Sequence, residues 1–166
     1  MRTGDHHIRW SAATADADAV LTSQLAGLGL GAARTGRLCP RCGASGHGRP
    51  WARAGDVEIP VSISRSGPHL VTVVGGTGVT ALGVDVEDVQ PGPGGWPLDT
   101  MLAPGEQLSG GPYAEARLWA AKEAVLKADG TGLDRAMVDV LVAAFDGEVT
   151  EVAAPPGYVA ALALRR

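Results

Sequence analysis

Aromatic residues are scarce in this sequence of 166 residues, which contains one Phe, two Tyr and four Trp. The hydrophobic core must therefore rely on Val, Leu and Ala, with the tryptophans as its few large members. No apolar run approaches the roughly 20 residues that a membrane-spanning helix requires. The polar segment Met1–Ser11 also lacks the apolar stretch of a secretory signal, which predicts a cytoplasmic protein that does not enter a membrane.

The sequence also lacks an excess of positive charge, because 18 acidic residues outweigh 14 Lys and Arg and give a formal net charge of −4. Proteins that bind the phosphate backbone of nucleic acids usually carry a basic surface, so we expect no nucleic-acid partner. A local basic pocket for a small phosphorylated ligand is still compatible with this charge.

Only two cysteines are present, Cys39 and Cys42, and both lie in one Cys-Pro-Arg-Cys-Gly segment. Half of a zinc ribbon has this pattern, but a complete site needs four ligands and there is no second cysteine pair. His47 and His69 would be needed to complete a Cys2His2 site. The interpretation preferred from sequence is a tight loop whose thiols stay reduced in the cytosol.

Hydrophobic periodicity and turn residues predict an α+β protein in which a helix followed by strands occurs twice. Helices are expected over 14–30 and 113–129, and strands over 57–63, 69–74, 79–86, 137–145, 148–153 and 157–164. Residues 31–56 and 91–112 are rich in Gly and Pro, so they are expected to be mostly irregular.

Asp85 and Glu87 lie two residues apart at the end of a predicted strand. Their side chains therefore share one face, whereas Leu82, Val84 and Val86 point into the core. Adjacent carboxylates repel each other unless a cation or a proton separates them, which favours a hard metal ion such as magnesium. The alternative is an ordinary amphipathic edge strand.

Trp119, Glu123 and Lys127 occupy positions i, i+4 and i+8 of the second predicted helix and so form one stripe. Glu123 would add a third carboxylate, and Lys127 would supply a phosphate contact. The bulky Trp119 at the head of the stripe indicates that the stripe faces something other than bulk water. The alternative is a surface ion pair between Glu123 and Lys127.

The segment Ser62–Gly67 runs from a strand into a turn that offers hydroxyl groups, backbone N–H groups and the cation of Arg65. Such groups can hold a phosphate. The alternative is an ordinary turn in which the hydroxyl groups bind the local backbone. A fourth segment, His47–Pro50, indicates little by itself.

In this order and spacing the segments resemble the 4′-phosphopantetheinyl transferase superfamily, of the monomeric type that activates peptide and polyketide synthetases. The resemblance covers about residues 47–133. Gly48–Pro50 corresponds to a Gly-Lys-Pro motif, and Ser62–Gly67 to an Asn-Ile-Ser-His-Ser-Gly turn. Gly83–Glu87 corresponds to Gly-(Ile/Val)-Asp-(Ile/Val)-Glu, Trp119–Lys127 to Trp-x-x-Lys-Glu-Ala-x-x-Lys, and Gly130–Leu133 to Gly-x-Gly-Leu.

The resemblance implies two related α+β lobes, residues 1–75 and 76–166, with a boundary near Gly75–Thr80 and the active site in the cleft between them. It also implies a monomer that transfers 4′-phosphopantetheine from coenzyme A to a serine of an apo acyl or peptidyl carrier protein. In this magnesium-dependent reaction the serine attacks the β-phosphate, and adenosine 3′,5′-bisphosphate is released.

For the site, the resemblance implies that Asp85, Glu87 and Glu123 bind the magnesium ion. Asp85, Glu123 and Lys127 are then the expected catalytic residues, with Glu123 or a metal-bound water as the base and Lys127 at the phosphates. Further coenzyme A contacts are expected from His47, Gly48, Arg49 and Pro50 at the adenine, Ser64 and Arg65 at the pyrophosphate and 3′-phosphate, and Lys122 at the mouth.

The sequence departs from the family pattern at two of these positions. Arg65 stands where the family usually has His, which keeps a phosphate contact but removes a proton-transfer role. Arg49 replaces the usual Lys, so the positive charge of the side chain is kept but its shape changes. The segment ahead of Gly48 is also short, and the candidates within it for the 3′-phosphate contact are Arg34, Arg37, Arg41 and Arg53.

Two other functions stay open at this stage. A degenerate family member would bind coenzyme A or a carrier protein without catalysis, although the intact residues at 85, 87, 123 and 127 argue against it. A small zinc-binding interaction module would be built on Cys39 and Cys42. The sequence does not identify the carrier. The loop Gly92–Gly111, with Trp96 and Met101 expected to be exposed, is a hypothesis for the surface that contacts it, and a disordered connector is the alternative.

Overall fold

The computed structural model describes residues 6–90 and 92–166, apart from the side chain of Leu133. Residues 1–5, Pro91 and the Leu133 side chain belong to segments considered above and lie outside the described residues. The helices are α1 (Ala17–Gly27), α2 (Leu98–Met101) and α3 (Ala114–Asp129), with 3-10 turns η1 (Gly132–Asp134), η2 (Met137–Asp139) and η3 (Val142–Ala144). The strands are β1 (His6–Ala12), β2 (Arg34–Leu38), β3 (Arg49–Ala54), β4 (Val57–Ile59), β5 (Val61–Ser66), β6 (His69–Gly75), β7 (Ala81–Asp88), β8 (Glu148–Val152) and β9 (Tyr158–Arg165).

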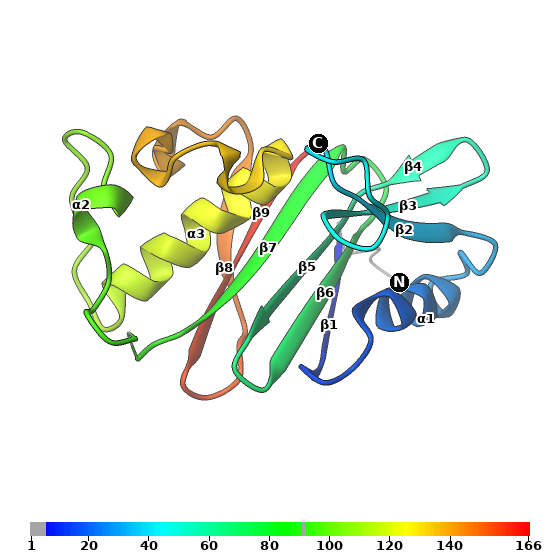
Figure 1. Cartoon of the computed structure of the whole chain (residues 1–166), viewed down its shortest axis with the longest axis horizontal. Helices are drawn as coiled ribbons and strands as arrows, with labels where there is room; N and C mark the ends of the chain where they lie inside the picture. Colours follow the sequence, from blue (N-terminus) through cyan, green and yellow to red (C-terminus); the bar gives the residue numbers. More distant parts are fainter. Residues whose placement is uncertain (1–5, 91) are drawn as a thin grey trace.

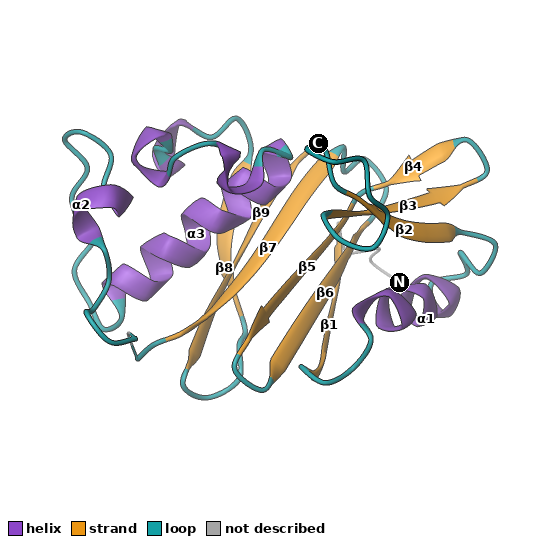
Figure 2. Cartoon of the chain, viewed as in Figure 1, coloured by secondary structure: helices purple, strands orange, loops and turns teal. Residues whose placement is uncertain are grey.

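The described strands form three antiparallel sheets of three strands each, in the orders β1-β6-β5, β2-β3-β4 and β7-β9-β8 (Figures 1 and 2). This mixture of helices and small sheets confirms the predicted α+β class. None of the described helices combines the length and the apolar character that crossing a membrane demands.

The first and third sheets have the same topology. In each sheet the first strand, β1 or β7, lies at one edge, and a helix follows it in the chain. The last strand, β6 or β9, lies in the centre of the sheet and pairs with the first strand. The strand before the last occupies the other edge and forms a hairpin with it. The helix-then-strands order that the sequence repeats therefore corresponds to two units of the same connectivity, with the β2-β3-β4 sheet added to the first.

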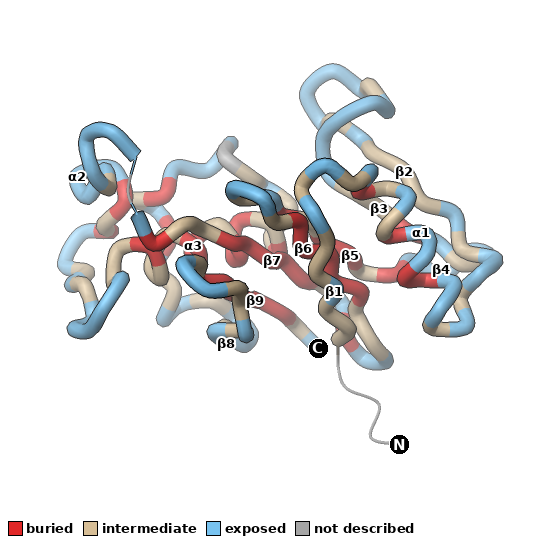
Figure 3. The backbone as a smooth tube through the Cα atoms, turned by 90° about the horizontal axis from the view of Figure 1, so that it is seen from below, coloured by how far each residue is buried: buried red, intermediate tan, exposed pale blue. Residues whose placement is uncertain are grey.

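The two units meet where β5 lies beside β7, as Figure 1 shows. The strands are joined here through a side chain, because Ser62 Oγ on β5 accepts a hydrogen bond of 3.0 Å from the backbone N–H of Val84 on β7. Val71 and Val73 of β6 pack on the face of β7 that carries Leu82 and Val84. Buried positions consequently run along the central strands, whereas the outer loops and α2 are largely exposed (Figure 3).

Helix α3 lies close to β7 and β9 because small side chains stand between them. Four alanines spaced four residues apart, Ala116, Ala120, Ala124 and Ala128, are buried on one face of the helix. They face the side of the sheet that carries Gly83, Ala161 and Ala163. A Cβ atom added at Gly83 would collide with the carbonyl oxygen of Ala124 and lie 2.6 Å from the backbone nitrogen of Ala128.

The strongest sequence predictions are confirmed. Helix α3 begins one residue after Tyr113 and ends at Asp129, followed by Gly130 in the left-handed region at φ 73°. On β7 the alternation holds, because Leu82, Val84 and Val86 enter one core cluster while position 83 faces the helix. Strands β6, β8 and β9 also form at the predicted places.

Residues 31–56 are irregular over most of their length, as predicted, but β2 and β3 also form there and pair with each other, which the sequence patterns do not predict. Neither strand alternates buried apolar with polar side chains, so periodicity gives no signal. Besides the backbone pairing, the Trp51 ring covers its cross-strand partner Gly36 so closely that a Cβ at position 36 would lie 2.7 Å from the ring.

Two further expectations are corrected. The predicted strand at 137–145 is a pair of 3-10 turns, because only Met137 and Val140, three residues apart, are buried. The predicted strand at 57–63 is divided at Pro60, which has no N–H for the ladder, into β4 and β5. Strand β1 was not anticipated, although Ile8 and Trp10 alternate with polar residues and pack on the central core.

We expect Gly83→Ala to lower the free energy of unfolding by about 3 kcal/mol, because its methyl group must displace backbone atoms of α3. Gly110→Ala is the matched control, since Gly110 has open space at its Cβ position and no left-handed φ. Urea unfolding of both variants measures the difference. Equal stability of the two variants would show that α3 does not depend on this close approach.

Candidate functional site

Asp85 lies within β7 on the side of α3, and the residue is only 3% exposed. Its Oδ1 atom accepts hydrogen bonds from Ser64 Oγ at 2.7 Å and from Lys127 Nζ at 2.5 Å. Ser64 belongs to β5 and Lys127 to the last turn of α3. Three elements from distant parts of the chain therefore meet at one carboxylate.

The ammonium group of Lys127 is anchored by three partners at this point. Besides Asp85 it donates to Ser64 Oγ and to the carbonyl oxygen of Val84, both at 3.1 Å. An ammonium group has three N–H donors, so all of them are engaged. A phosphate oxygen bound by Lys127 would have to replace one of these partners, and the exposed quarter of the side chain leaves room for that exchange.

The second oxygen of Asp85, Oδ2, is buried and has no hydrogen-bond partner among the described residues. A buried carboxylate oxygen without a partner is costly, because it has lost water and gained nothing in return. The atom is thus an acceptor that a ligand could satisfy.

Two more carboxylates lie close enough to Asp85 to feel its charge. Burial, repulsion from Asp85, a hydrogen bond that protonated Glu87 donates to Asp85 and repulsion from Glu123, in that order, raise the pKa of Glu87 to about 8 against the opposing effect of Lys127. Burial and repulsion from Asp85 also raise the pKa of Glu123, against the opposing effect of Lys127. The structure therefore brings the three predicted metal-binding carboxylates into one group with unfavourable mutual repulsion.

These side chains fit a hard divalent cation. Their donors are carboxylate oxygens, their like charges repel, and Asp85 Oδ2 has no protein partner. They are not drawn tightly together: among the described residues, the only His, Cys, Asp or Glu group with ligand atoms all within 4.8 Å is Cys39, Cys42 and His47. The carboxylates would have to move inward to share one ion.

A cavity of about 340 Å³ lies between the start of β3 and the end of α3. Gly48, Arg49 and Pro50 line it together with Lys127 of α3. Arg49 lies against the helix end, because a Cβ at Gly130 would collide with its guanidinium group. Two predicted binding segments are thus joined by one cavity.

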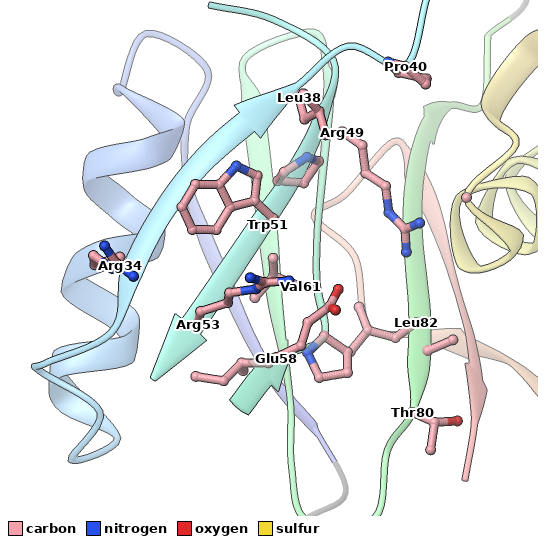
Figure 4. A pocket seen from close by; sticks show the side chains of 15 residues that line it. Arg34, Leu38, Pro40, Arg49, Trp51, Arg53, Glu58, Val61, Thr80 and Leu82 are labelled. Carbon is pink, nitrogen blue, oxygen red and sulfur yellow. The ribbon is translucent and has the colours of Figure 1, made fainter. Parts of the chain in front are cut away.

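A larger cavity of about 580 Å³ continues on the other side of Arg49. Figure 4 shows Trp51, Arg53 and Glu58 from the β2-β3-β4 sheet on one side of it, with Leu82 and Thr80 on the other. Arg34 is the cross-strand partner of Arg53. Of the four arginine candidates, Arg34 and Arg53 line this cavity, and Arg37 and Arg41 line the smaller one.

His47 and Arg65 line a third cavity, which lies at the start of α1. Arg65 is exposed and donates to the carbonyl oxygen of Ala15 at 2.9 Å. Its neighbour Ser64 is buried and points to Asp85 instead. Ser64 and Arg65, which are neighbours on β5, therefore make contacts on different sides of the strand.

A comparison against known protein families gives a match. Residues 81–154 match the 4′-phosphopantetheinyl transferase superfamily. No curated protein matches the chain.

The segment that matches the phosphopantetheinyl transferase superfamily is less than half of the chain. It extends from the start of β7 to just beyond β8 and contains the three carboxylates and Lys127. Ser64, Arg65 and the segment His47–Pro50 lie outside it. The roles of the residues inside and outside the matching segment stay predictions.

The expected position of Lys122 at the mouth of the transferase site is wrong. Its side chain is fully buried, its Nζ lies 2.5 Å from Glu106 Oε2, and it donates to the carbonyl oxygens of Met101 at 2.6 Å and Met137 at 3.2 Å. Met101 is itself 0% exposed, so the expectation that it is exposed is also wrong. Through these contacts, Lys122 of α3 binds both the segment between β7 and α3 and the turn η2.

Glu106 is a partner that sequence reasoning missed. It lies in the Gly- and Pro-rich segment before α3, where no periodicity distinguishes a buried residue from an exposed one. Its Oε2 atom also accepts a hydrogen bond of 2.9 Å from the backbone N–H of Ala103, which fixes the loop conformation.

We expect Lys122→Met to lower the free energy of unfolding by about 3–5 kcal/mol, because the Glu106 carboxylate would be left buried without a counter-charge. The double variant Lys122→Met with Glu106→Gln should recover most of that loss. Denaturant unfolding of the two variants measures both effects. A single variant as stable as the parent would contradict a buried ion pair.

The stability of the protein in chelator should fall as pH rises from about 4.5 to about 8, with a slope from Glu87 of at most about 1.4 kcal/mol per pH unit. In this window the folded state keeps a proton on Glu87 that the unfolded state has released, so proton loss favours unfolding. Glu87→Gln should flatten this part of the curve. Parallel stability curves for parent and variant would show that Glu87 titrates normally.

Proposed function

We propose that this chain transfers the 4′-phosphopantetheine group of coenzyme A to a serine of an apo acyl or peptidyl carrier protein. The observation that carries the proposal is the buried Asp85, whose Oδ2 has no hydrogen-bond partner among the described residues, beside Glu87, Glu123 and Lys127. Of these residues, Lys127 lines a basic cavity. The superfamily match over the same residues supports phosphopantetheine transfer. The two units of like topology, with a boundary near residues 75–80, would be its related lobes.

Coenzyme A would occupy the smaller cavity and continue past Arg49 into the larger one. Arg49 and Lys127 both line the smaller cavity and would attract the phosphates. Arg34 and Arg53 are the preferred contacts of the 3′-phosphate, because they face each other across β2 and β3 as like charges, although Arg53 also faces Glu58 across β3 and β4. Arg37 and Arg41 are already paired with Asp18 and Asp134.

Asp85, Glu87 and Glu123 would hold magnesium, which when bound would neutralise negative charge on the pyrophosphate oxygens. Asp85 is fixed for this by Ser64 and Lys127, which both bind Oδ1 and leave Oδ2 available. Asp85 would therefore stay in place when the ion binds, whereas Glu87 and Glu123 would have to move toward it.

In the reaction, the serine oxygen forms a bond to the β-phosphorus, and the bond from that phosphorus to the bridging oxygen of adenosine 3′,5′-bisphosphate breaks. The serine proton would pass to Glu123, whose pKa is raised by burial and by Asp85 toward the range of an effective base. Lys127 would stabilise the departing phosphate by exchanging one of its three protein partners for a phosphate oxygen.

A second candidate function is binding of coenzyme A without transfer. The observation that favours it is Arg65, which stands at the family's His position yet is exposed, bonded to Ala15 and on a different cavity from Lys127. A group oriented in this way would not act on the reacting phosphate unless the turn rearranged.

Intact-mass spectrometry of an apo carrier protein incubated with this protein, coenzyme A and magnesium tests the proposal. We expect a gain of one phosphopantetheine mass that is lost in chelator and slowed at least about 100-fold by Glu123→Gln. Glu115→Gln, two turns earlier on α3, is the matched control and should retain the activity. Binding of coenzyme A without mass gain across a panel of apo carriers would favour the second function.

A further inference from the structure

The loop between β2 and β3 brings together both cysteines of the chain and one histidine. Cys39 follows the last residue of β2, and His47 lies two residues before β3. The Cys42 Sγ and His47 Nε2 atoms are 3.4 Å apart, and the ligand atoms of all three side chains lie within 4.8 Å of one another. Both cysteines are free thiols.

The backbone of this loop is folded as a tight knuckle around Cys39. The N–H of Gly43 donates to the carbonyl oxygen of Cys39 at 2.8 Å, and the N–H of Cys39 donates to the carbonyl oxygen of Ala44 at 3.0 Å. Gly43 adopts a left-handed φ of 71°, which a side chain would oppose. The chain thus reverses within the Cys-Pro-Arg-Cys-Gly segment and presents both sulfur atoms to the same side.

Backbone donors also point at the Cys39 sulfur. Hydrogen bonds from the N–H groups of Cys42 and Arg41 lower the pKa of Cys39 to about 7, which favours the thiolate. Thiolates are the form in which cysteine binds metals. These N–H groups would stay in place as supports for a sulfur ligand.

Apart from these bonds, the Arg41–Asp134 ion pair and a hydrogen bond of 3.4 Å from Arg37 to the carbonyl oxygen of Gly48 hold the loop, and no apolar packing supports it. Its residues from Pro40 to Gly48 are almost all exposed, and none of them belongs to a hydrophobic cluster among the described residues. At Gly48 the backbone comes back so close to the start of the loop that a Cβ on this residue would lie 2.6 Å from the Cα of Cys39. A compact, exposed loop without a core is the usual setting of a structural metal ion.

The histidine distinguishes a metal site from a pair of thiols that form a disulfide. A disulfide requires only the two cysteines, whereas His47 places a third, nitrogen ligand against Cys42. His69, considered above as a fourth ligand, lies elsewhere: its ring contacts Tyr158 at 4.6 Å and Trp10 at 6.2 Å between centroids. The Cys2His2 site considered from the sequence is therefore wrong in its fourth member.

We propose that Cys39, Cys42 and His47 bind a zinc ion, with the fourth coordination position open to solvent. Two sulfur ligands and one imidazole nitrogen suit zinc better than magnesium or calcium, which prefer oxygen. Binding would release the thiol protons of both cysteines to solvent and leave His47 neutral. His47 would then be a metal ligand and not the adenine contact expected from the resemblance.

The zinc ion would fix one wall of the 340 Å³ cavity. Cys39, Pro40 and Arg41 line this cavity together with Gly48 and Arg49, which follow His47 directly in the chain. Tying residue 39 to residue 47 would therefore set the position at which Arg49 enters the cavity. The site itself does not depend on the proposed transfer reaction.

Metal analysis of the purified full-length chain, after gel filtration without chelator, tests the site. We expect stoichiometric zinc in the parent, and less than about a tenth of it in Cys42→Ser and His47→Ala. His7→Gln is the matched control, because His7 lies on β1 and outside the ligand group. The substituted residues are exposed, so thermal unfolding should show that both variants still fold.

Cobalt substitution and X-ray absorption identify the ligands without any variant. We expect a thiolate-to-cobalt charge-transfer band, and zinc with two sulfur neighbours at about 2.3 Å and lighter neighbours at about 2.0 Å. Absence of bound metal, zinc that persists in both ligand variants, or a Cys39–Cys42 disulfide that forms in the presence of zinc would overturn the proposal. Phosphopantetheine transfer enters none of these measurements.

Discussion

The close contact between α3 and β7 is the interaction on which the candidate site depends. Gly83 has no side chain, and the alanine stripe of α3 faces it, so the two backbones approach each other directly. The helix therefore places Lys127 over the strand, where its ammonium group reaches both the Val84 carbonyl oxygen and Asp85. A bulkier residue at position 83 would lift the helix and separate Lys127 from the carboxylate.

The junction of the two units is made by hydroxyl groups where a continuous sheet would use backbone pairing. Ser62 accepts the N–H of Val84, and Ser64 donates to Asp85, so β5 and β7 are joined while each pairs with other strands. Polar groups at this edge are satisfied by side chains of fixed length, which sets the separation of the strands. Ser64 therefore both joins the two units and orients the Asp85 carboxylate.

Charge is distributed unevenly about this junction. Three carboxylates gather on one side of it, with raised pKa values for Glu87 and Glu123, whereas arginines from β2, β3 and the loop between them line the adjoining cavities. The formal net charge of −4 does not reveal that acidic and basic side chains are grouped on different sides of the junction. A ligand that carries phosphates and binds with a cation would complement both sides at once, since its phosphates meet the arginines and its cation meets the carboxylates.

The sequence by itself determined the features that short-range patterns encode. The alternation of Leu82, Val84 and Val86 and the i, i+4 stripe of α3 fix which residues share a face, because the periods of strand and helix are local properties. The tertiary structure alone decided which faces meet: it buried Lys122 against Glu106, brought Ser64 to Asp85 and gathered Cys39, Cys42 and His47. Such contacts depend on packing between segments far apart in the chain or on loops without periodicity, where one amino-acid pattern is compatible with many arrangements.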